Sequence, residues 1–96
     1  MIYVLLYLQF SDSSSWRKAF RDHAKWMRHY HRAGKIVTGG PLSDLTGAVG
    51  ILHVESMAEA HDIAEKEPFV CQGIARMTLS EWNPLIHGSI GNKPLS

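Results

Sequence analysis

The chain contains, at residues 2–8, the unbroken apolar run Ile2-Tyr3-Val4-Leu5-Leu6-Tyr7-Leu8. Apolar runs of this length are typical of central β-strands that are covered on both faces. The run lacks a basic leader and a small-residue cleavage site, and it is too short to span a bilayer. We therefore interpret it as the central strand of a sheet, and we predict neither a signal peptide nor a membrane segment.

Downstream of this strand, hydrophobic periodicity and Gly, Pro and Ser residues divide the chain into further elements. The polar loop Ser11–Ser15 offers several N-caps for a long helix, and Gly34 is a natural stop for that helix. Ser56 and Glu59 form a capping box for a second helix. The predicted helices span residues 16–33 and 56–66, and the remaining strands span 35–38, 48–55 and 74–82, with a break at Gly39-Gly40-Pro41 and a short turn from Glu67-Pro68 to Gly73.

The order β-α-β-β-α-β is that of the split βαβ arrangement, a ferredoxin-like α+β fold. In this fold four antiparallel strands form one sheet, and both helices lie on the same face. The apolar first strand also needs cover on the opposite face, which the helices cannot supply. We therefore expect a homodimer, or a larger homo-oligomer, in which two sheets pack face to face. The periodic pattern ends near residue 84, so we predict one domain at 1–84 and a C-terminal tail at 85–96.

Net charge and cysteine content narrow the functional classes. The formal net charge is +1, and Cys71 is the single cysteine of the chain. A lone cysteine forms no intrachain disulfide and fits a reducing cytoplasm. A net charge this close to zero argues against nucleic-acid and membrane partners. We rank nucleic-acid binding by the basic face of the first helix as the last hypothesis.

His23 lies in the middle of the apolar stripe of the first predicted helix. At about 100° per residue, apolar side chains such as Trp16 and Trp26 lie within about 60° of His23. The basic side chains lie on the far side, and Arg21 is about 160° around from His23. An imidazole in this position either makes a buried hydrogen bond or carries out proton chemistry in a dry pocket.

Two carboxylates are candidate partners for that imidazole. Glu67 precedes Pro68, where it is either a helix N-cap or the group that orients His23. Asp44 is a rival, although its setting is typical of an ordinary turn residue. Gly40 and Pro41 either form a strand-end turn or let the backbone approach a ligand closely.

The remaining motifs argue against a bound cofactor. The chain has no glycine-rich nucleotide-binding motif. His29 and His31 are about 200° apart on a helix, so they cannot chelate one metal together. We therefore predict no metal, no haem and no other cofactor. Aromatic side chains either line a pocket or pack in the core or a dimer contact, and these are Trp16, Trp26, Phe69 and Trp82.

Several short motifs follow one another in order over residues 1 to about 84, and they are Tyr3-Val4-Leu5-Leu6-Tyr7, His23, Gly34, Gly39-Gly40-Pro41-Leu42, Gly47, Glu59-Ala60, Glu67-Pro68-Phe69, Gly73 and Trp82-Asn83-Pro84. Together they resemble the YciI-like (YCII-related) family of small dimeric α+β barrel proteins. The resemblance implies a ferredoxin-like protomer that dimerises through its sheet into an α+β barrel. It also implies a pocket between the helices and the sheet, near the histidine.

The resemblance implies acid/base chemistry of the lyase, dehydrohalogenase or isomerase type on a small organic compound. Family members pair this histidine with the Asp of an Asp-Pro-Phe motif, and the present chain has Glu67 at that position. We therefore expect cofactor-independent proton transfer by the histidine. The expected substrates are small organic compounds, aromatic compounds included. The alternative is a non-catalytic dimeric module that binds a small molecule or serves as an accessory protein. The predicted site comprises catalytic His23 and Glu67 and substrate-binding Gly40, Pro41, Phe69 and Trp82.

Overall fold

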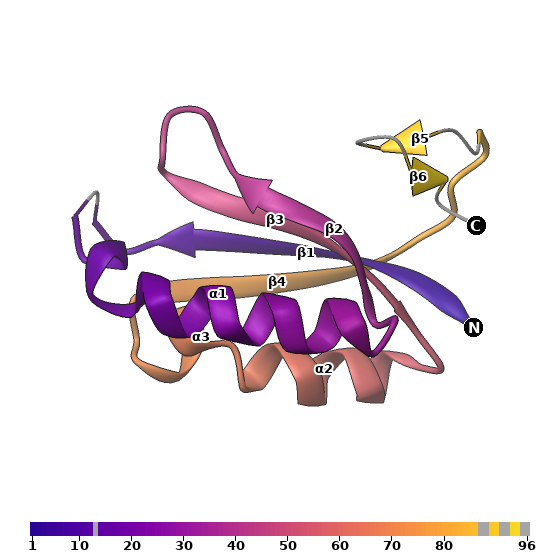
Figure 1. Cartoon of the computed structure of the whole chain (residues 1–96), viewed down its shortest axis with the longest axis horizontal. Helices are drawn as coiled ribbons and strands as arrows, with labels where there is room; N and C mark the ends of the chain where they lie inside the picture. Colours follow the sequence, from indigo (N-terminus) through magenta and orange to yellow (C-terminus); the bar gives the residue numbers. More distant parts are fainter. Residues whose placement is uncertain (13, 87–88, 91–92, 95–96) are drawn as a thin grey trace.

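A single four-stranded antiparallel sheet organises the molecule (Figure 1). The computed structural model describes residues 1–12, 14–86, 89–90 and 93–94. The strand order is β2-β3-β1-β4, so the apolar first strand is central, as predicted. The fold is α+β, with strands β1 (Ile2–Phe10), β2 (Ile36–Pro41), β3 (Gly47–Val54) and β4 (Ala75–Trp82), and helices α1 (Trp16–Arg32), α2 (Met57–Glu65) and α3 (Pro68–Cys71).

The ends of α1 follow from local chemistry. Before the helix, the Asp12 carboxylate accepts hydrogen bonds from the backbone N–H groups of Ser14 and Ser15, at 2.9 and 2.7 Å. After it, Gly34 adopts a positive φ of 77° that an L side chain rarely tolerates. Its N–H donates to the carbonyl of His31, and the next N–H donates back to Tyr30, which closes a Schellman motif. The predicted stop at Gly34 is therefore confirmed.

The capping box of α2 is present in a modified form. The Ser56 hydroxyl accepts from the Glu59 N–H at 3.1 Å, as predicted. The Glu59 carboxylate reaches back to the N–H of Glu55 and also pairs with Lys35 at 2.9 Å. Both contacts, the Glu55 N–H first, hold the pKa of Glu59 below its ordinary value. The box thereby ties the start of α2 to the segment that follows α1.

The second strand differs from its prediction. A break was expected at Gly39-Gly40-Pro41, but β2 continues through these residues and ends at Pro41. A Cβ at Gly39 would approach the Val49 carbonyl oxygen at 3.2 Å, so the glycine lets β2 lie close to β3. Pro41 is tolerated because β2 is an edge strand, where a missing N–H need not break the ladder.

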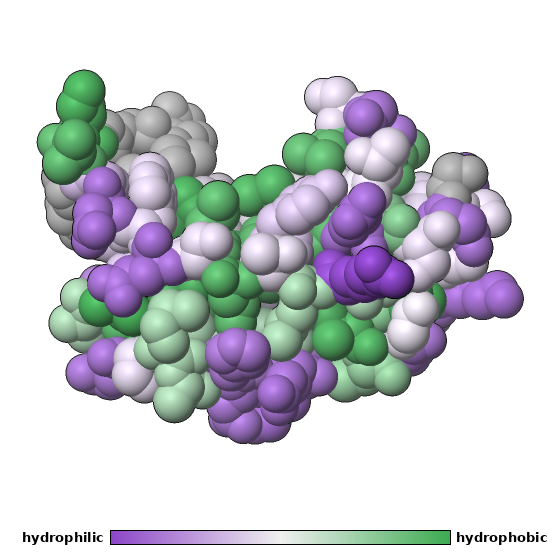
Figure 2. Space-filling model, turned by 180° about the vertical axis from the view of Figure 1, so that it is seen from behind, coloured by the Kyte–Doolittle hydropathy of each residue, from purple (hydrophilic) through white to green (hydrophobic). Residues whose placement is uncertain are grey.

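The hydrophobic core lies between the sheet and the helices, which are all on one side of it (the lower side in Figure 1). Along β1, Val4, Leu6 and Leu8 are buried in this core, whereas Leu5 points to the other side and is 37% exposed. In the view from behind, hydrophobic residues extend through the middle of the surface between hydrophilic ones (Figure 2). The second face of the sheet therefore lacks a covering helix, and the sheet-to-sheet homodimer stays a prediction.

The chain leaves the sheet after Trp82. Residues 89–90 (β5) and 93–94 (β6) pair antiparallel as a separate two-stranded sheet (upper right in Figure 1). The sequence pattern indicated no strand in this tail, and the domain boundary at residue 84 stays a prediction. Within the described part of the chain, no helix is long and apolar enough to cross a membrane.

Candidate active site

Glu67 is the N-cap of α3 and the second of the two residues that connect α2 to α3. Its backbone N–H donates to the carbonyl of Ala64 at 3.1 Å, and its own carbonyl accepts from the Val70 and Cys71 N–H groups at 2.9 Å. Its side-chain Oε2 accepts from the Val70 N–H at 3.2 Å, which caps α3. Pro68 fits the first helical turn because that position needs no N–H donor. The carboxylate is consequently held in place although it is completely buried.

The other carboxylate oxygen, Oε1, is hydrogen-bonded to Nδ1 of His23, 44 residues away in the sequence. His23 comes from the apolar stripe of α1 and is 9% exposed. Because a carboxylate accepts, a neutral imidazole in this pair carries its proton on Nδ1 and leaves Nε2 as an acceptor. Glu67 is thus both a helix cap and the partner of His23, roles that the sequence presented as alternatives.

Aromatic side chains fix the plane of the imidazole. The Phe69 ring stacks on His23 with a centroid separation of 4.4 Å and an angle of 22°. Trp26 lies nearly parallel to His23 at 6.1 Å, and its indole N–H donates to the carbonyl of Ile63 at 3.2 Å. These apolar neighbours exclude water from the His23–Glu67 pair, which strengthens its electrostatic interaction.

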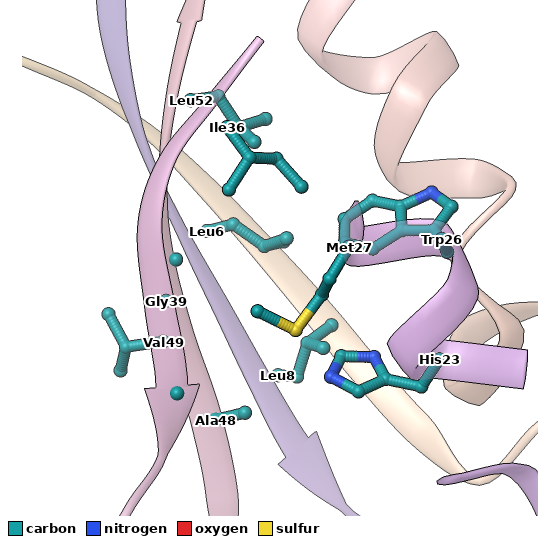
Figure 3. Close-up of a pocket in the computed structure, with 12 residues that line it drawn as sticks. Leu6, Leu8, His23, Trp26, Met27, Ile36, Gly39, Ala48, Val49 and Leu52 are labelled. Carbon is teal, nitrogen blue, oxygen red and sulfur yellow. The ribbon is translucent and has the colours of Figure 1, made fainter. Parts of the chain in front are cut away.

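Two hollows meet at His23 and Ala48. We call the larger one, of about 340 Å³, the outer pocket. The smaller one, of about 20 Å³, we call the inner slot, and it has room for about one water molecule. In Figure 3 the side chains of His23 and Met27 extend from α1 toward the strands across the inner slot. The outer pocket is lined by Phe10, Trp16, Phe20, His23, Pro41, Leu45, Ala48 and Phe69.

Most of the residues predicted for the site lie around these hollows. Pro41 and Phe69 line the outer pocket, and Gly40 lines the inner slot. Trp82 lines neither, because it pairs with Tyr3 at the opposite end of β1 from the pocket residue Phe10. Trp82 was assigned to the pocket because it is aromatic. Its register in β4 places it outside both hollows, so we correct that assignment.

The sequence interpretation missed several lining residues. Phe10 extends β1 beyond the predicted end of that strand, and Leu45 belongs to the turn between β2 and β3. Phe20 belongs to α1, and it is 53% exposed at the pocket. No spacing rule in the sequence pointed to Leu45, because its place depends on where the turn between β2 and β3 lies relative to α1.

The other candidate groups lie away from the pair. The Asp44 carboxylate accepts from the hydroxyl and then the N–H of Thr46, at 2.7 and 3.0 Å, which lowers its pKa and marks it as a turn residue. Cys71 is exposed, and its thiol donates to the Glu65 carbonyl. Among the residues that the structure describes, no three His, Cys, Asp or Glu side chains gather as a metal site would require.

Comparison with known proteins adds a family and a fold. The family model described as the YCII-related domain matches residues 1–83. The protein YjpA of Bacillus subtilis (strain 168), described as uncharacterized, is 28% identical over 60 residues, which cover 62% of this chain and 71% of YjpA.

A solved structure has the same fold. It is 5-chloro-2-hydroxyhydroquinone dehydrochlorinase (TftG) from Burkholderia phenoliruptrix AC1100, in complex with 2,5-dihydroxybenzoquinone. The two structures superpose with a TM-score of 0.62, at 23% sequence identity, over 83% of this chain and 93% of TftG. At this level of identity the likeness establishes the α+β fold.

Proposed function

The chain belongs to the YCII-related family, and from its buried His23–Glu67 pair we propose that it is a small, cofactor-independent enzyme of the lyase, dehydrohalogenase or isomerase type. The observation that carries the proposal is a carboxylate-bound imidazole at the wall of an apolar pocket of about 340 Å³. Pockets of this size hold small organic ligands. The substrate class is a small organic compound with an acidic C–H or O–H group, aromatic compounds included.

His23 serves as the general base in this mechanism. Its Nε2 lone pair takes the substrate proton, while Nδ1–H remains hydrogen-bonded to Glu67, whose negative charge stabilises the imidazolium. In a dehydrohalogenation, the substrate reacts through a tautomer whose halogen-bearing carbon is tetrahedral. The electron pair of the C–H or O–H bond that loses its proton moves through the conjugated system to form a new double bond, and the C–halogen bond breaks to release halide. The imidazolium then returns its proton to water. In an isomerisation, it returns the proton to a different carbon of the same molecule, so neither reaction needs a redox partner.

TftG suggests the first compounds to assay. That protein is a dehydrochlorinase and its complex contains a dihydroxybenzoquinone, so 5-chloro-2-hydroxyhydroquinone and related chlorinated phenols form the starting panel. Chloride release would be measured for the wild-type protein and for His23→Gln and Glu67→Gln. We expect each substitution to lower kcat at least about 100-fold, the usual contribution of a general base.

His29→Gln is the matched control, because His29 is an exposed histidine on the same helix. It should leave chloride release unchanged. If the His23→Gln protein turned over a substrate at the wild-type rate, the proposed mechanism would be ruled out for that substrate.

One observation favours a second candidate, a non-catalytic binding module. Glu67 caps α3, so the His23–Glu67 pair has a structural role that needs no chemistry. A module would bind the same compounds without converting them. The binding module would be identified if calorimetry detected binding of these compounds and no product formed after prolonged incubation at high protein concentration.

We also propose that two copies associate through the helix-free face of the sheet, in a reducing cytoplasm. Leu5 and Trp82, each 37% exposed, lie on that face, and Tyr3 and Tyr7 are only partly buried there. Light scattering at micromolar concentration should give twice the mass of the chain, and Leu5→Glu should restore the monomer. A monomeric wild-type protein would contradict the association.

A further inference from the structure

Leu45 has a backbone conformation that leucine rarely adopts. Its φ is +61°, and among the described residues no other non-glycine has a positive φ. The turn holds it there, because the Leu45 N–H donates to the carbonyl of Leu42 at 2.9 Å and the Asp44 carboxylate binds Thr46. Glycine or asparagine would fit this position with less strain. Strained residues of this kind are enriched at ligand sites.

The Leu45 side chain is only partly buried in return. It is 41% exposed, and it lines the outer pocket together with Phe20 from α1, which is 53% exposed. Two large apolar side chains from different elements therefore stand half-open to solvent around one cavity. Such exposure is unfavourable for the free protein and becomes favourable when an apolar surface covers it.

The charge of the pocket indicates what that surface is. His23 is the one titratable side chain among the described residues that line the outer pocket. Arg17 stacks on the ring of Trp16 at 5.1 Å, but it is exposed and does not line the pocket. A carboxylate that entered would lose its hydration without gaining a cationic partner. A hydroxyl could instead donate to Nε2 of His23.

We propose that Leu45 determines specificity by contacting the face of an uncharged ring compound whose hydroxyl group points to His23. This role of Leu45 rests on the proposed function only because it uses the same pocket. It concerns the binding of the ligand and not its turnover. The ring fills the outer pocket between Leu45 and Phe69, and the hydroxyl provides the polar end of the ligand.

Two probes of equal ring size test the charge requirement. The wild-type protein would be titrated with 2-naphthol and with 2-naphthoate at pH 7 in a calorimeter. We expect 2-naphthol to bind at least about tenfold more tightly, because only the naphthoate carries an unpaired charge into the pocket. Equal binding, or tighter binding of 2-naphthoate, would overturn the assignment and indicate that Arg17 reaches the ligand.

The role of Leu45 is tested with Leu45→Gly. This substitution removes the side chain and also relieves the positive φ, so the melting temperature should stay equal or rise. The Kd for 2-naphthol should increase about tenfold through the lost apolar contact. Leu85→Gly is the control, because Leu85 is 92% exposed and lines neither hollow.

An unchanged Kd in Leu45→Gly, or a lower melting temperature, would show that Leu45 serves the turn and not the ligand. The outcome is separable from the proposed chemistry. If His23→Gln left turnover intact while Leu45→Gly weakened 2-naphthol binding, the mechanism would fail and the specificity assignment would stand.

Discussion

A carboxylate stands before each of two helices of this protein, and the two carboxylates lie in opposite environments. Asp12 precedes α1 and accepts hydrogen bonds from the N–H groups of Ser14 and Ser15. Glu67 precedes α3 and accepts from the Val70 N–H. Asp12 is exposed, whereas Glu67 is completely buried and uses its second oxygen to bind His23.

The difference shows how burial turns a carboxylate that binds nearby N–H groups into a candidate catalytic group. The Ser15 hydroxyl and the neighbouring N–H groups lower the pKa of Asp12, and water solvates the rest of its charge. Glu67 has no such solvation, so a buried charge there requires a partner that donates to it. His23 supplies the donor, and its free Nε2 becomes available for proton transfer.

Removing the buried carboxylate should have the largest effect. In Glu67→Ala, Nδ1 of His23 and the Val70 N–H both lose their acceptor, so we expect the free energy of unfolding to fall by about 3 kcal/mol. Urea denaturation would measure this. Asp12→Ala is the comparison, and a loss as large as that of Glu67→Ala would contradict the distinction between the buried and the exposed carboxylate.

A double-mutant cycle should give the next largest effect. His23→Phe leaves the Glu67 carboxylate buried without its donor, and Glu67→Leu leaves the imidazole without its acceptor. The double variant His23→Phe/Glu67→Leu removes both polar groups, so it should be about 2 kcal/mol more stable than the sum of the single losses predicts. Additive losses in urea denaturation would show that the pair is not energetically coupled.

The other end of α1 should contribute a smaller amount. Gly34→Ala places an L residue at a φ of 77°, with open space around the new Cβ. The cost is therefore conformational alone, and we expect a loss of about 1 kcal/mol. Gly40→Ala is the control, because its Cβ also meets open space but its φ is not positive. Equal losses in the two variants would refute the conformational explanation.

The smallest effect is expected at the exposed carboxylate. Because the folded-state pKa of Asp12 is lowered, the ionised group stabilises the fold above its unfolded-state pKa of about 3.9. That contribution is lost as the pH falls through the lower folded-state value. Asp12→Asn should therefore melt slightly below wild type at pH 7, and the gap should close as the pH falls below about 4.

Asp22→Asn, an exposed substitution on α1, is the reference for the pH experiment. A gap between wild type and Asp12→Asn that widened in acid would contradict the sign of the effect. Chloride release should be the same in all three proteins, since neither carboxylate lines the pocket.

The parts of the fold that were predicted correctly depend on near neighbours in the sequence. The apolar run at residues 2–8 indicated a central strand because runs of this length are typical of strands inside a sheet. Gly34 indicated the end of α1 through its conformational freedom. The continuation of β2 through Gly39 was missed, because it depends on the close approach of Val49 in another strand.

The candidate site shows the same division. The sequence alone placed His23 on the apolar stripe of α1 and Glu67 at the start of a short helix, since both facts follow from residue spacing and the proline. Only the tertiary structure brought the two side chains together, excluded Trp82, and added Leu45 to the pocket. The physical reason is that pairing and burial depend on how sheet and helices pack across long separations, and no local pattern carries that information.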